Sequence, residues 1–395
     1  MNEEIFDRYM QAGKTAADVL NKGATLIKPG GHAFESHQAH PYLPGILNDI
    51  LMLCPVCGID HIIPASDLIS RRKTLFSPCS DCCSEVFDKR SPPVKEPGEV
   101  CSCGKAFIDD VFVRLYHCLI DAGLLSGNEP LSAVGTPLID PGLYLRAPPH
   151  LPLRSLLIIS SVFDADTAQR AYRTIPHISG ILSDCQKPPG IGDTWGDSEP
   201  VWSEHTLLCG CDVRADLFST SRGPVAIYKK QGSAHIEFPH GLDPKIRSLE
   251  SAIRTVHPDL MVDACSGSGT LGISSMRLGV DHVILNDPWY AAAFFSGFNL
   301  MVNHDILGLN ECTICYDFSD FSCKPVRKTS LLVAEGFGDN KHIEVFQGMM
   351  ESLPPRVSSG RILTAYDPFD KGVSDQNQSL LSFWHKEVGG EVFIP

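Results

Sequence analysis

The sequence predicts an α/β protein, and three observations lead to this prediction. From about residue 246 to the C-terminus, short apolar segments alternate with helical patterns, as they do in parallel, doubly wound sheets. Residues 128–245 mix short strands with helical patterns, and seven of the 15 cysteines lie between residues 54 and 103. We therefore expect a helical, cysteine-rich region over 1–127, a mixed α+β region over 128–245 and a doubly wound domain over 246–395.

The composition is that of a globular protein. Of the 395 residues, 43% are hydrophobic and 20% are charged, which excludes a mostly disordered chain. The net charge of -14 argues against a broad nucleic-acid-binding surface, although a local basic patch stays open. No apolar run is long enough to cross a membrane, and the acidic N-terminus is not a secretory signal. We expect a cytoplasmic protein that does not bind membranes; its oligomeric state is open.

Two pairs of cysteines have the spacing of metal ligands. Cys54 and Cys57 form one C-x-x-C pair, and Cys79 and Cys82 form another, with 21 residues between the two pairs. Thiols stay reduced in a chain without a secretion signal, so paired cysteines point to a metal rather than to disulfides. Two such pairs complete a tetrahedron around one ion. The sequence therefore predicts a zinc site with these four ligands, with iron as the alternative metal.

Other cysteines leave the ligand set open. Cys101 and Cys103 can replace one of the two pairs, or can hold a second ion together with Cys83. Further along the chain, Cys209 and Cys211 form a C-x-C pair that suits a metal ligand, a nucleophile or two small buried residues equally well.

A glycine-rich turn follows the first strand of the C-terminal domain. The apolar segment 260–263 ends at Asp263, and Gly267 and Gly269 precede a helical pattern. Glycines let the backbone turn sharply and approach a ligand, and the helix N-terminus offers free N–H groups. A carboxylate beside this turn disfavours a pyrophosphate and favours the cationic methionine end of S-adenosylmethionine. We therefore expect Asp263, Gly267 and Gly269 to contact that cofactor.

A second acidic residue ends the next apolar strand. Asp287 closes the segment 283–287, eighteen residues after Gly269. A carboxylate at this place can hold both hydroxyls of a ribose, in S-adenosylmethionine or in a dinucleotide. Asp287 can also cap the helix that follows it. We expect it to bind the ribose.

Two further acidic residues are predicted at strand ends. Strands are predicted over 312–316, 330–334, 361–365 and 391–394, and helices over 271–278, 290–303, 343–353 and 379–388. Because ligands lie outside the carboxyl ends of parallel strands, we expect Asp317 and Phe318 to contact the adenine. The remaining strand-end acid, Glu335, is by elimination the candidate catalytic residue beside the methyl acceptor.

Residues 259–395 resemble class I S-adenosylmethionine-dependent methyltransferases. The segments 263–273 and 283–287, with the helix to Asn303, most resemble ribosomal-RNA guanine methyltransferases and tRNA guanine dimethyltransferases. The resemblance implies a Rossmann-like sheet, S-adenosylmethionine as cofactor and methyl transfer to a macromolecule, RNA or protein.

The chain departs from these families at one motif. Base-amine methyltransferases carry an Asp/Asn-Pro-Pro-aromatic motif after the fourth strand, where this chain has Glu335-Gly336-Phe337-Gly338. Tyr366-Asp367-Pro368-Phe369 has a suitable composition but follows the next predicted strand. The alternative is therefore a non-catalytic protein that binds S-adenosylmethionine or acts as a scaffold.

Overall fold

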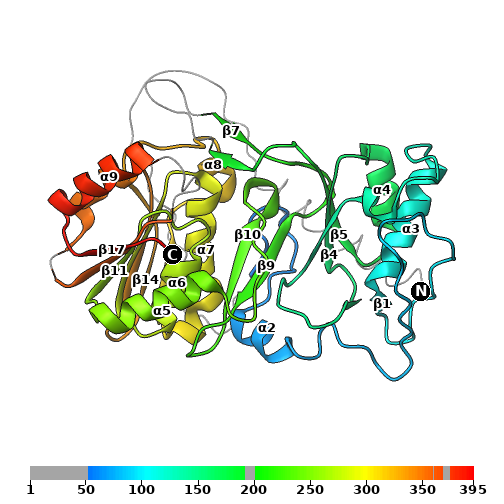
Figure 1. Ribbon diagram of the computed structural model, residues 1–395. Helices are drawn as coiled ribbons and strands as arrows, with labels where there is room; N and C mark the ends of the chain where they lie inside the picture. Colours follow the sequence, from blue (N-terminus) through cyan, green and yellow to red (C-terminus); the bar gives the residue numbers. More distant parts are fainter. Residues whose placement is uncertain (1–51, 192–200, 359, 368–373) are drawn as a thin grey trace, which may run out of the picture.

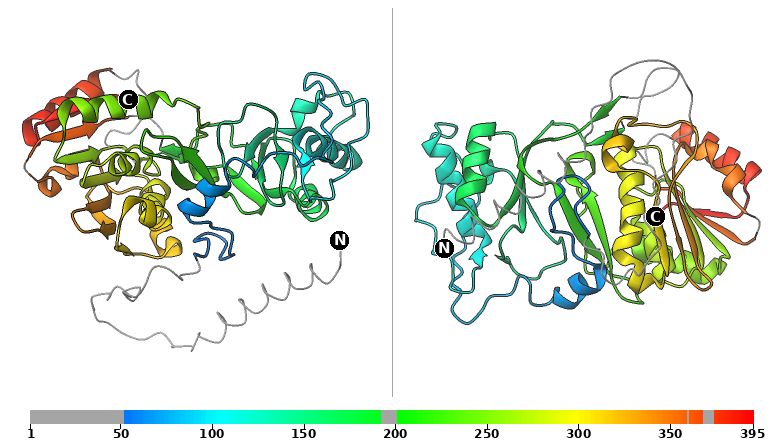
Figure 2. Two further views of the ribbon diagram at one scale, coloured as in Figure 1. Left: turned by 90° about the horizontal axis from the view of Figure 1, so that it is seen from below. Right: turned by 180° about the vertical axis from the view of Figure 1, so that it is seen from behind.

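The protein forms two lobes that lie side by side, with a β-hairpin between them (Figures 1 and 2). The computed structural model describes residues 52–191, 201–358, 360–367 and 374–395. One lobe is built on a seven-stranded sheet and the other on a four-stranded sheet. Within the described residues, no helix is both long and apolar enough to cross a membrane.

The seven-stranded sheet confirms the predicted Rossmann-like, doubly wound fold. Its strand order is β13-β14-β15-β12-β11-β16-β17. The strands are β11 (Leu260–Asp263), β12 (His282–Asp287), β13 (Glu311–Ile314), β14 (Leu331–Phe337), β15 (His342–Gln347), β16 (Ile362–Ala365) and β17 (Glu391–Phe393). All neighbouring pairs from β15 to β17 are parallel. The helices are α5 (Pro244–Val256), α6 (Thr270–Arg277), α7 (Tyr290–Leu307), α8 (Phe318–Ser322) and α9 (Ser374–Glu387).

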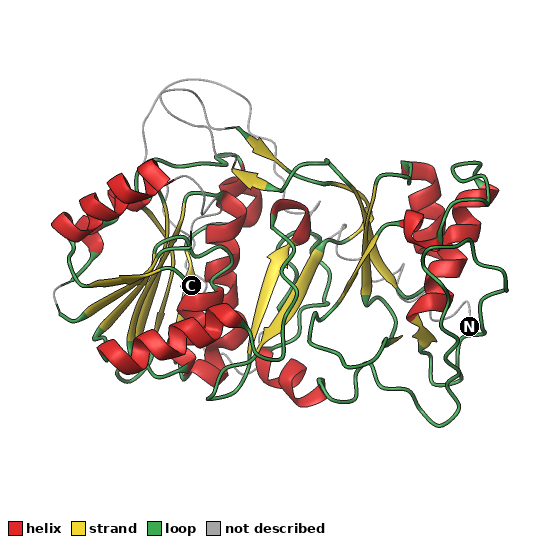
Figure 3. Cartoon of the chain, in the orientation of Figure 1, coloured by secondary structure: helices red, strands yellow, loops and turns green. Residues whose placement is uncertain are grey.

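Helices cover both faces of this sheet (Figure 3). The alternation of side chains along each strand separates two cores. Met261 and Leu285 point towards α6 and α7, whereas Val262 and Ile284 belong to a smaller core with Trp384 of α9. The carboxyl ends of β11, β12 and β16 meet at one edge, since Asp263 pairs with both Leu285 and Ala365.

Three predicted elements differ from the structure in their place or type. The strands predicted over 312–316 and 330–334 are not inner parallel strands, because β13, β14 and β15 form an antiparallel meander at the edge of the sheet. The helix predicted over 343–353 begins instead as β15, in which Ile343 and Val345 are buried while Glu344 is half-buried. This period of two fits a strand. β16 is therefore the fourth parallel strand, next to β11.

The second lobe has its own hydrophobic core. Its sheet has the order β2-β4-β5-β8, and its helices pack against one another and against this sheet. Its elements are β2 (Thr136–Ile139), β4 (Leu156–Ser160), β5 (Ile178–Ser183), β8 (Thr206–Gly210), α3 (Ile108–Asp121), α4 (Ala165–Thr174) and the small pair β1 (Ala106–Phe107)–β3 (His150–Leu151). A second small pair, β6 (Gly190–Ile191)–β7 (Trp202–Ser203), lies between the lobes (Figure 1).

The hairpin between the lobes is held by asparagine side chains of α7. It consists of β9 (Val213–Phe218) and β10 (Val225–Lys230). Asn303 accepts from the Ala226 N–H at 2.9 Å and donates to its carbonyl at 2.6 Å. Asn299 does the same for Tyr228, at 2.7 and 2.8 Å. One helical turn therefore satisfies two alternate residues of the free edge of β10.

The start of the described chain packs on this hairpin, whereas the part of the cysteine-rich region that follows it packs in the second lobe. The short helix α2 (Ala65–Arg71) lies against α7 and β10 (Figure 1). Ile62 and Leu68 belong to the same core as α7, whereas Phe76 and Phe87 belong to the core of the second lobe. The chain thus crosses from one lobe to the other near residue 72.

We predict that Asn303→Ala lowers the free energy of unfolding by about 2 to 4 kcal/mol, because the buried N–H and C=O of Ala226 would lose their partners. Asn310→Ala is the matched control, since Asn310 is exposed and bonds to Asp339 at the surface. It should change stability by less than about 0.5 kcal/mol. Urea unfolding followed by fluorescence measures both values, and equal losses would contradict this role for Asn303.

Candidate functional site

The glycine-rich turn has the geometry that the sequence predicts. It joins β11 to α6, and both Gly267 (φ 54°) and Gly269 (φ 93°) have left-handed backbone conformations that favour glycine. A Cβ on Gly269 would lie 3.0 Å from the Leu285 side chain, whereas one on Gly267 would meet nothing within 4 Å. The turn is therefore packed against β12 at Gly269 and open at Gly267. Ser296 and Asn299 of α7 hold the Gly267 and Ser268 carbonyls at 2.9 and 3.0 Å.

Asp263 is a fully buried carboxylate beside this turn. Its Oδ2 atom accepts the Gly272 N–H at 2.8 Å, while its Oδ1 atom is buried and has no hydrogen-bond partner among the described residues. Burial raises the pKa of Asp263 to about 7, and the nearby carboxylates of Asp367 and Asp287 act in the same direction. An unpartnered buried oxygen is costly, and a cationic ligand group would relieve that cost.

Asp287 joins the end of β12 to the glycine turn. Its two carboxylate oxygens accept the N–H groups of Gly267 at 3.0 Å and Trp289 at 2.8 Å. Burial raises the pKa of Asp287 to about 7, although both hydrogen bonds favour the charged form. The structure thus brings Asp263, Gly267, Gly269 and Asp287 together at one edge of the sheet.

Asp317 and Phe318 lie on a different part of the edge from the one predicted. They follow β13, which is the outermost strand, and β15 takes the place next to β12. Phe318 packs its ring against Phe294 and Tyr290 of α7, with centroid distances of 5.0 and 5.8 Å. The order of strands from which the adenine contact was predicted is therefore wrong.

Glu335 does not follow a strand at this edge. It lies within β14, opposite Thr313 on one side and Glu344 on the other. Glu344 in turn pairs with Ile284, three residues before Asp287. The elimination that placed Glu335 beside the methyl acceptor is wrong, because β14 is antiparallel and Glu335 lies below the edge.

Asp367 was not among the predicted site residues, but the structure places it at this edge. Asp367 follows β16, two residues after Ala365, which pairs with Asp263. Its carboxylate lies 2.6 Å from the Nζ atom of Lys245 in the first turn of α5. The sequence signal is Tyr366-Asp367-Pro368-Phe369, and its place at this edge follows only because β13 and β14 are edge strands rather than inner ones.

The four predicted metal ligands belong to two separate clusters. In the first, Cys79 and Cys82 meet Cys101 and Cys103, with Sγ–Sγ distances of 3.6 Å (Cys79–Cys82), 3.4 Å (Cys79–Cys101) and 3.7 Å (Cys82–Cys103). For a zinc–sulfur bond of about 2.3 Å, the edge of a tetrahedron is about 3.8 Å. Cys83 is not part of this cluster. We call Cys79, Cys82, Cys101 and Cys103 the four-thiol cluster.

In the second cluster, Cys54 and Cys57 meet His61 and Cys211. The Sγ atoms of Cys54 and Cys211 are 3.8 Å apart, and Cys57 Sγ lies 3.3 Å from His61 Nε2. Cys209 points the other way, into the core of the second lobe, and donates to the Ala168 carbonyl at 3.3 Å. We call this the mixed cluster. His61 and Cys211 are not among the predicted ligands.

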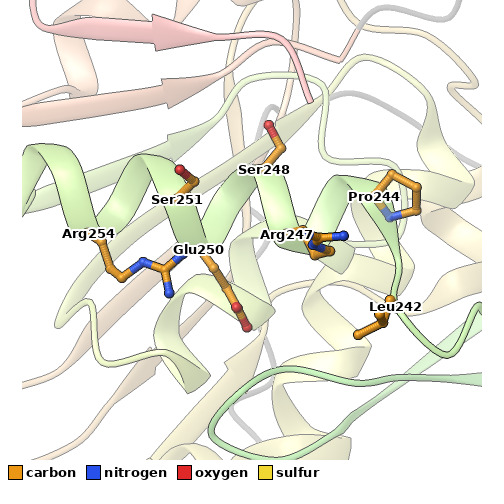
Figure 4. Close-up of a pocket in the computed structure, with 7 residues that line it drawn as sticks. All are labelled: Leu242, Pro244, Arg247, Ser248, Glu250, Ser251 and Arg254. Atoms are coloured by element: carbon orange, nitrogen blue, oxygen red, sulfur yellow. The ribbon is translucent and has the colours of Figure 1, made fainter.

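A surface pocket of about 410 Å³ lies along the outer face of α5 (Figure 4). It is lined by Leu242, Pro244, Arg247, Ser248, Glu250, Ser251 and Arg254. Asp263, Asp287 and Asp367 do not line it, so it is separate from the carboxylate edge.

No protein-family model and no curated protein matches the chain. Parts of it are similar to solved structures. Trm1 from Pyrococcus horikoshii with S-adenosyl-L-methionine is 17% identical over 45% of this chain and 42% of that one, with a TM-score of 0.29. The tRNA m1G37 methyltransferase of M. jannaschii is 13% identical, with 57% and 55% covered and a TM-score of 0.31. TYW2 from P. horikoshii in complex with MeSAdo is 15% identical, with 49% and 60% covered and a TM-score of 0.27.

The chain thus spans less than two thirds of the length of each of these three structures. TM-scores near 0.3 do not establish a shared fold, so the assignment of the sheet rests on its strand order and register.

Proposed function

We propose that the protein is an S-adenosylmethionine-dependent methyltransferase that acts on a macromolecule, RNA or protein. The observation that carries the proposal is the buried, unpartnered oxygen of Asp263 beside the open backbone at Gly267. Three carboxylates, those of Asp263, Asp287 and Asp367, face this edge from three neighbouring strands. Such a site repels the pyrophosphate of a dinucleotide and attracts a cation.

The residues present fit this cofactor. Asp263 offers its free oxygen to the ammonium group of the methionine part, and Gly267 allows close approach to the backbone. Each oxygen of Asp287 accepts one backbone N–H and keeps a second lone pair. Those lone pairs can accept the two ribose hydroxyls. When bound, S-adenosylmethionine supplies an electrophilic methyl group.

Asp367 is the residue that we expect to hold the methyl acceptor. Base-amine methyltransferases, which the chain resembles, carry an acidic or amide residue followed by proline after the fourth parallel strand, and β16 has that place here. Asp367 and Pro368 match the motif, with one proline instead of two. The ammonium group of Lys245 lies beside Asp367 and stabilises its charge. An ionised Asp367 can accept an N–H bond from the acceptor amine and orient the nitrogen lone pair for transfer.

The position of β16 also bears on the alternative of a non-catalytic scaffold. That alternative was based on a missing motif after the fourth strand. Asp367 and Pro368, which follow β16 in the sequence, offer a form of that motif with one proline, and this supports a catalytic role over the scaffold.

We further propose that the four-thiol cluster binds zinc. Four cysteine sulfurs within tetrahedral distances are the ligand set of a structural zinc site. The cluster closes the chain between residues 79 and 103, a stretch with little secondary structure. The ion would therefore hold a loop-rich region that has few buried apolar side chains.

For the cofactor, we predict that S-adenosylhomocysteine binds the wild-type protein and that Asp287→Ala weakens binding at least about tenfold, since hydrogen bonds to a charged group are lost. Isothermal titration calorimetry measures both affinities. Asp281→Ala is the control, because Asp281 is exposed at the other end of β12 and should leave the affinity unchanged. Tight binding of a nicotinamide dinucleotide, with none of S-adenosylhomocysteine, would refute the proposal.

For the acceptor, we predict that Asp367→Asn lowers turnover at least about tenfold while the affinity for S-adenosylhomocysteine changes less than about threefold, because the lost contact is made to the acceptor. The assay follows transfer of a labelled methyl group from S-adenosylmethionine into RNA and protein fractions. If Glu335→Gln, rather than Asp367→Asn, lowers turnover, the assignment of the acceptor side fails. Label in neither fraction would favour the scaffold.

A further inference from the structure

We propose that the mixed cluster of Cys54, Cys57, His61 and Cys211 binds a second zinc ion, and that this ion positions the cofactor-binding turn. The link to the cofactor rests on the proposed function, whereas the metal site itself does not. All four ligand atoms lie within 4.8 Å of one another.

The distances fit a tetrahedral ion rather than a disulfide. The 3.8 Å between the Cys54 and Cys211 sulfurs equals the edge of about 3.8 Å expected for zinc with two sulfur ligands, and is far above a disulfide bond of about 2.05 Å. The 3.3 Å between Cys57 Sγ and His61 Nε2 is close to the edge of about 3.6 Å expected for a sulfur and a nitrogen ligand. Three sulfurs and one imidazole are a common zinc ligand set.

The backbone around the cluster is shaped to present these ligands. The Gly58 N–H donates to the Cys54 carbonyl at 2.9 Å, and Gly58 has a left-handed φ of 71° that closes the turn. Cys211 lies 157 residues after Cys54 in the sequence. Gly210 turns the chain with a φ of 75°, and a Cβ there would lie 2.1 Å from the Ser179 carbonyl oxygen. This turn directs Cys211 towards Cys54 while Cys209 faces the opposite core.

A short series of hydrogen bonds leads from this cluster to the glycine turn. The Ile63 N–H donates to the Tyr228 hydroxyl at 2.9 Å, and that hydroxyl donates to the Ile63 carbonyl at 3.2 Å. The backbone of Tyr228 is bonded at both its N–H and its C=O to the side chain of Asn299. The same amide donates to the Ser268 carbonyl within the cofactor-binding turn. His61 is two residues from Ile63, so an ion at the cluster fixes the first member of this series.

Among the described residues, no such series of hydrogen bonds leads from the four-thiol cluster to the glycine turn. The neighbouring side chains Phe76 and Phe87 pack in the core of the second lobe, and Lys105 bonds to the carbonyls of Thr74 and Ser77. Loss of an ion there should loosen that region alone. The two clusters therefore make opposite predictions for cofactor binding.

The metal content of the unaltered protein is the first test. Elemental analysis should find two zinc ions per chain. X-ray absorption at the zinc edge should give about 3.5 sulfur and 0.5 nitrogen ligands per ion, the mean of one four-sulfur and one three-sulfur site. One zinc per chain would overturn the second site, and an all-sulfur average would overturn the ligand set that includes His61.

Variants then separate the two ions. Cys211→Ser should leave one zinc and weaken binding of S-adenosylhomocysteine at least about fivefold, within the range of coupling between sites. Cys79→Ser should also leave one zinc but change the affinity less than about twofold, and Cys209→Ser should keep both ions. Equal effects of Cys211→Ser and Cys79→Ser on affinity would refute the coupling.

A conservative variant keeps the test valid if Cys211→Ser does not fold. His61→Cys should retain two zinc ions and shift the average coordination from about 3.5 to about 4 sulfur ligands. An unchanged average would show that His61 is not a ligand. If the wild-type protein fails to bind S-adenosylhomocysteine, the proposed function fails, while the zinc content and the absorption spectrum still decide the metal site.

Discussion

The hydrogen bonds between two asparagines of α7 and the free edge of β10 connect the parts of this protein. An exposed strand edge leaves N–H and C=O groups without partners, and burying it requires that each be satisfied. Asn299 and Asn303 lie four residues apart on a helix and meet alternate residues of a strand. Because the spacing of the two asparagines fits the spacing of the strand residues, the hairpin packs on α7. α2 and the mixed cluster in turn pack on the hairpin. Asn299 also reaches Ser268, so the same contacts fix the glycine turn.

The electrostatics of the carboxylate edge explain which ligand this turn can take. Burial raises the pKa of both Asp263 and Asp287 to about 7, because the folded protein solvates their charged forms poorly. Lys245 lies beside Asp367 and offsets only part of the negative charge. Binding a cationic ligand compensates the remainder, whereas a pyrophosphate would add to the repulsion. Glycine-rich turns before a helix often bind phosphate groups, but the carboxylates beside this turn favour a cationic ligand instead.

Much of the proposed cofactor site could be predicted from local sequence. Asp263, Gly267, Gly269 and Asp287 lie within one strand–turn–helix–strand unit, where spacing alone fixes their relation. The proposed acceptor side of the site could not be predicted in this way, because the position of Asp367 depends on which strand pairs with β11. β14 and the segment that forms β15 are apolar enough to be read as an inner strand and a helix, and only pairing across the sheet shows that they form an edge meander.

The proposed metal ligands show the same limit. The two C-x-x-C pairs are visible in the sequence, but their partners are set by the fold. Cys211 is 157 residues from Cys54, and it reaches the cluster because Gly210 turns the chain between the two lobes. The nearby His61 was missed because a single histidine carries no spacing signal of its own.

The pH dependence of cofactor binding tests the central claim, that Asp263 binds a cationic group, most directly. The pKa of Asp263 is raised from 3.8 to about 7, so the carboxyl is largely neutral below pH 7 and must lose its proton to bind an ammonium group. The affinity for S-adenosylhomocysteine should therefore fall as the pH falls below 7. Asp263→Asn should reduce the slope of log affinity against pH by about one, which corresponds to one linked proton. The same slope in both proteins, or an affinity that rises as the pH falls, would contradict the account.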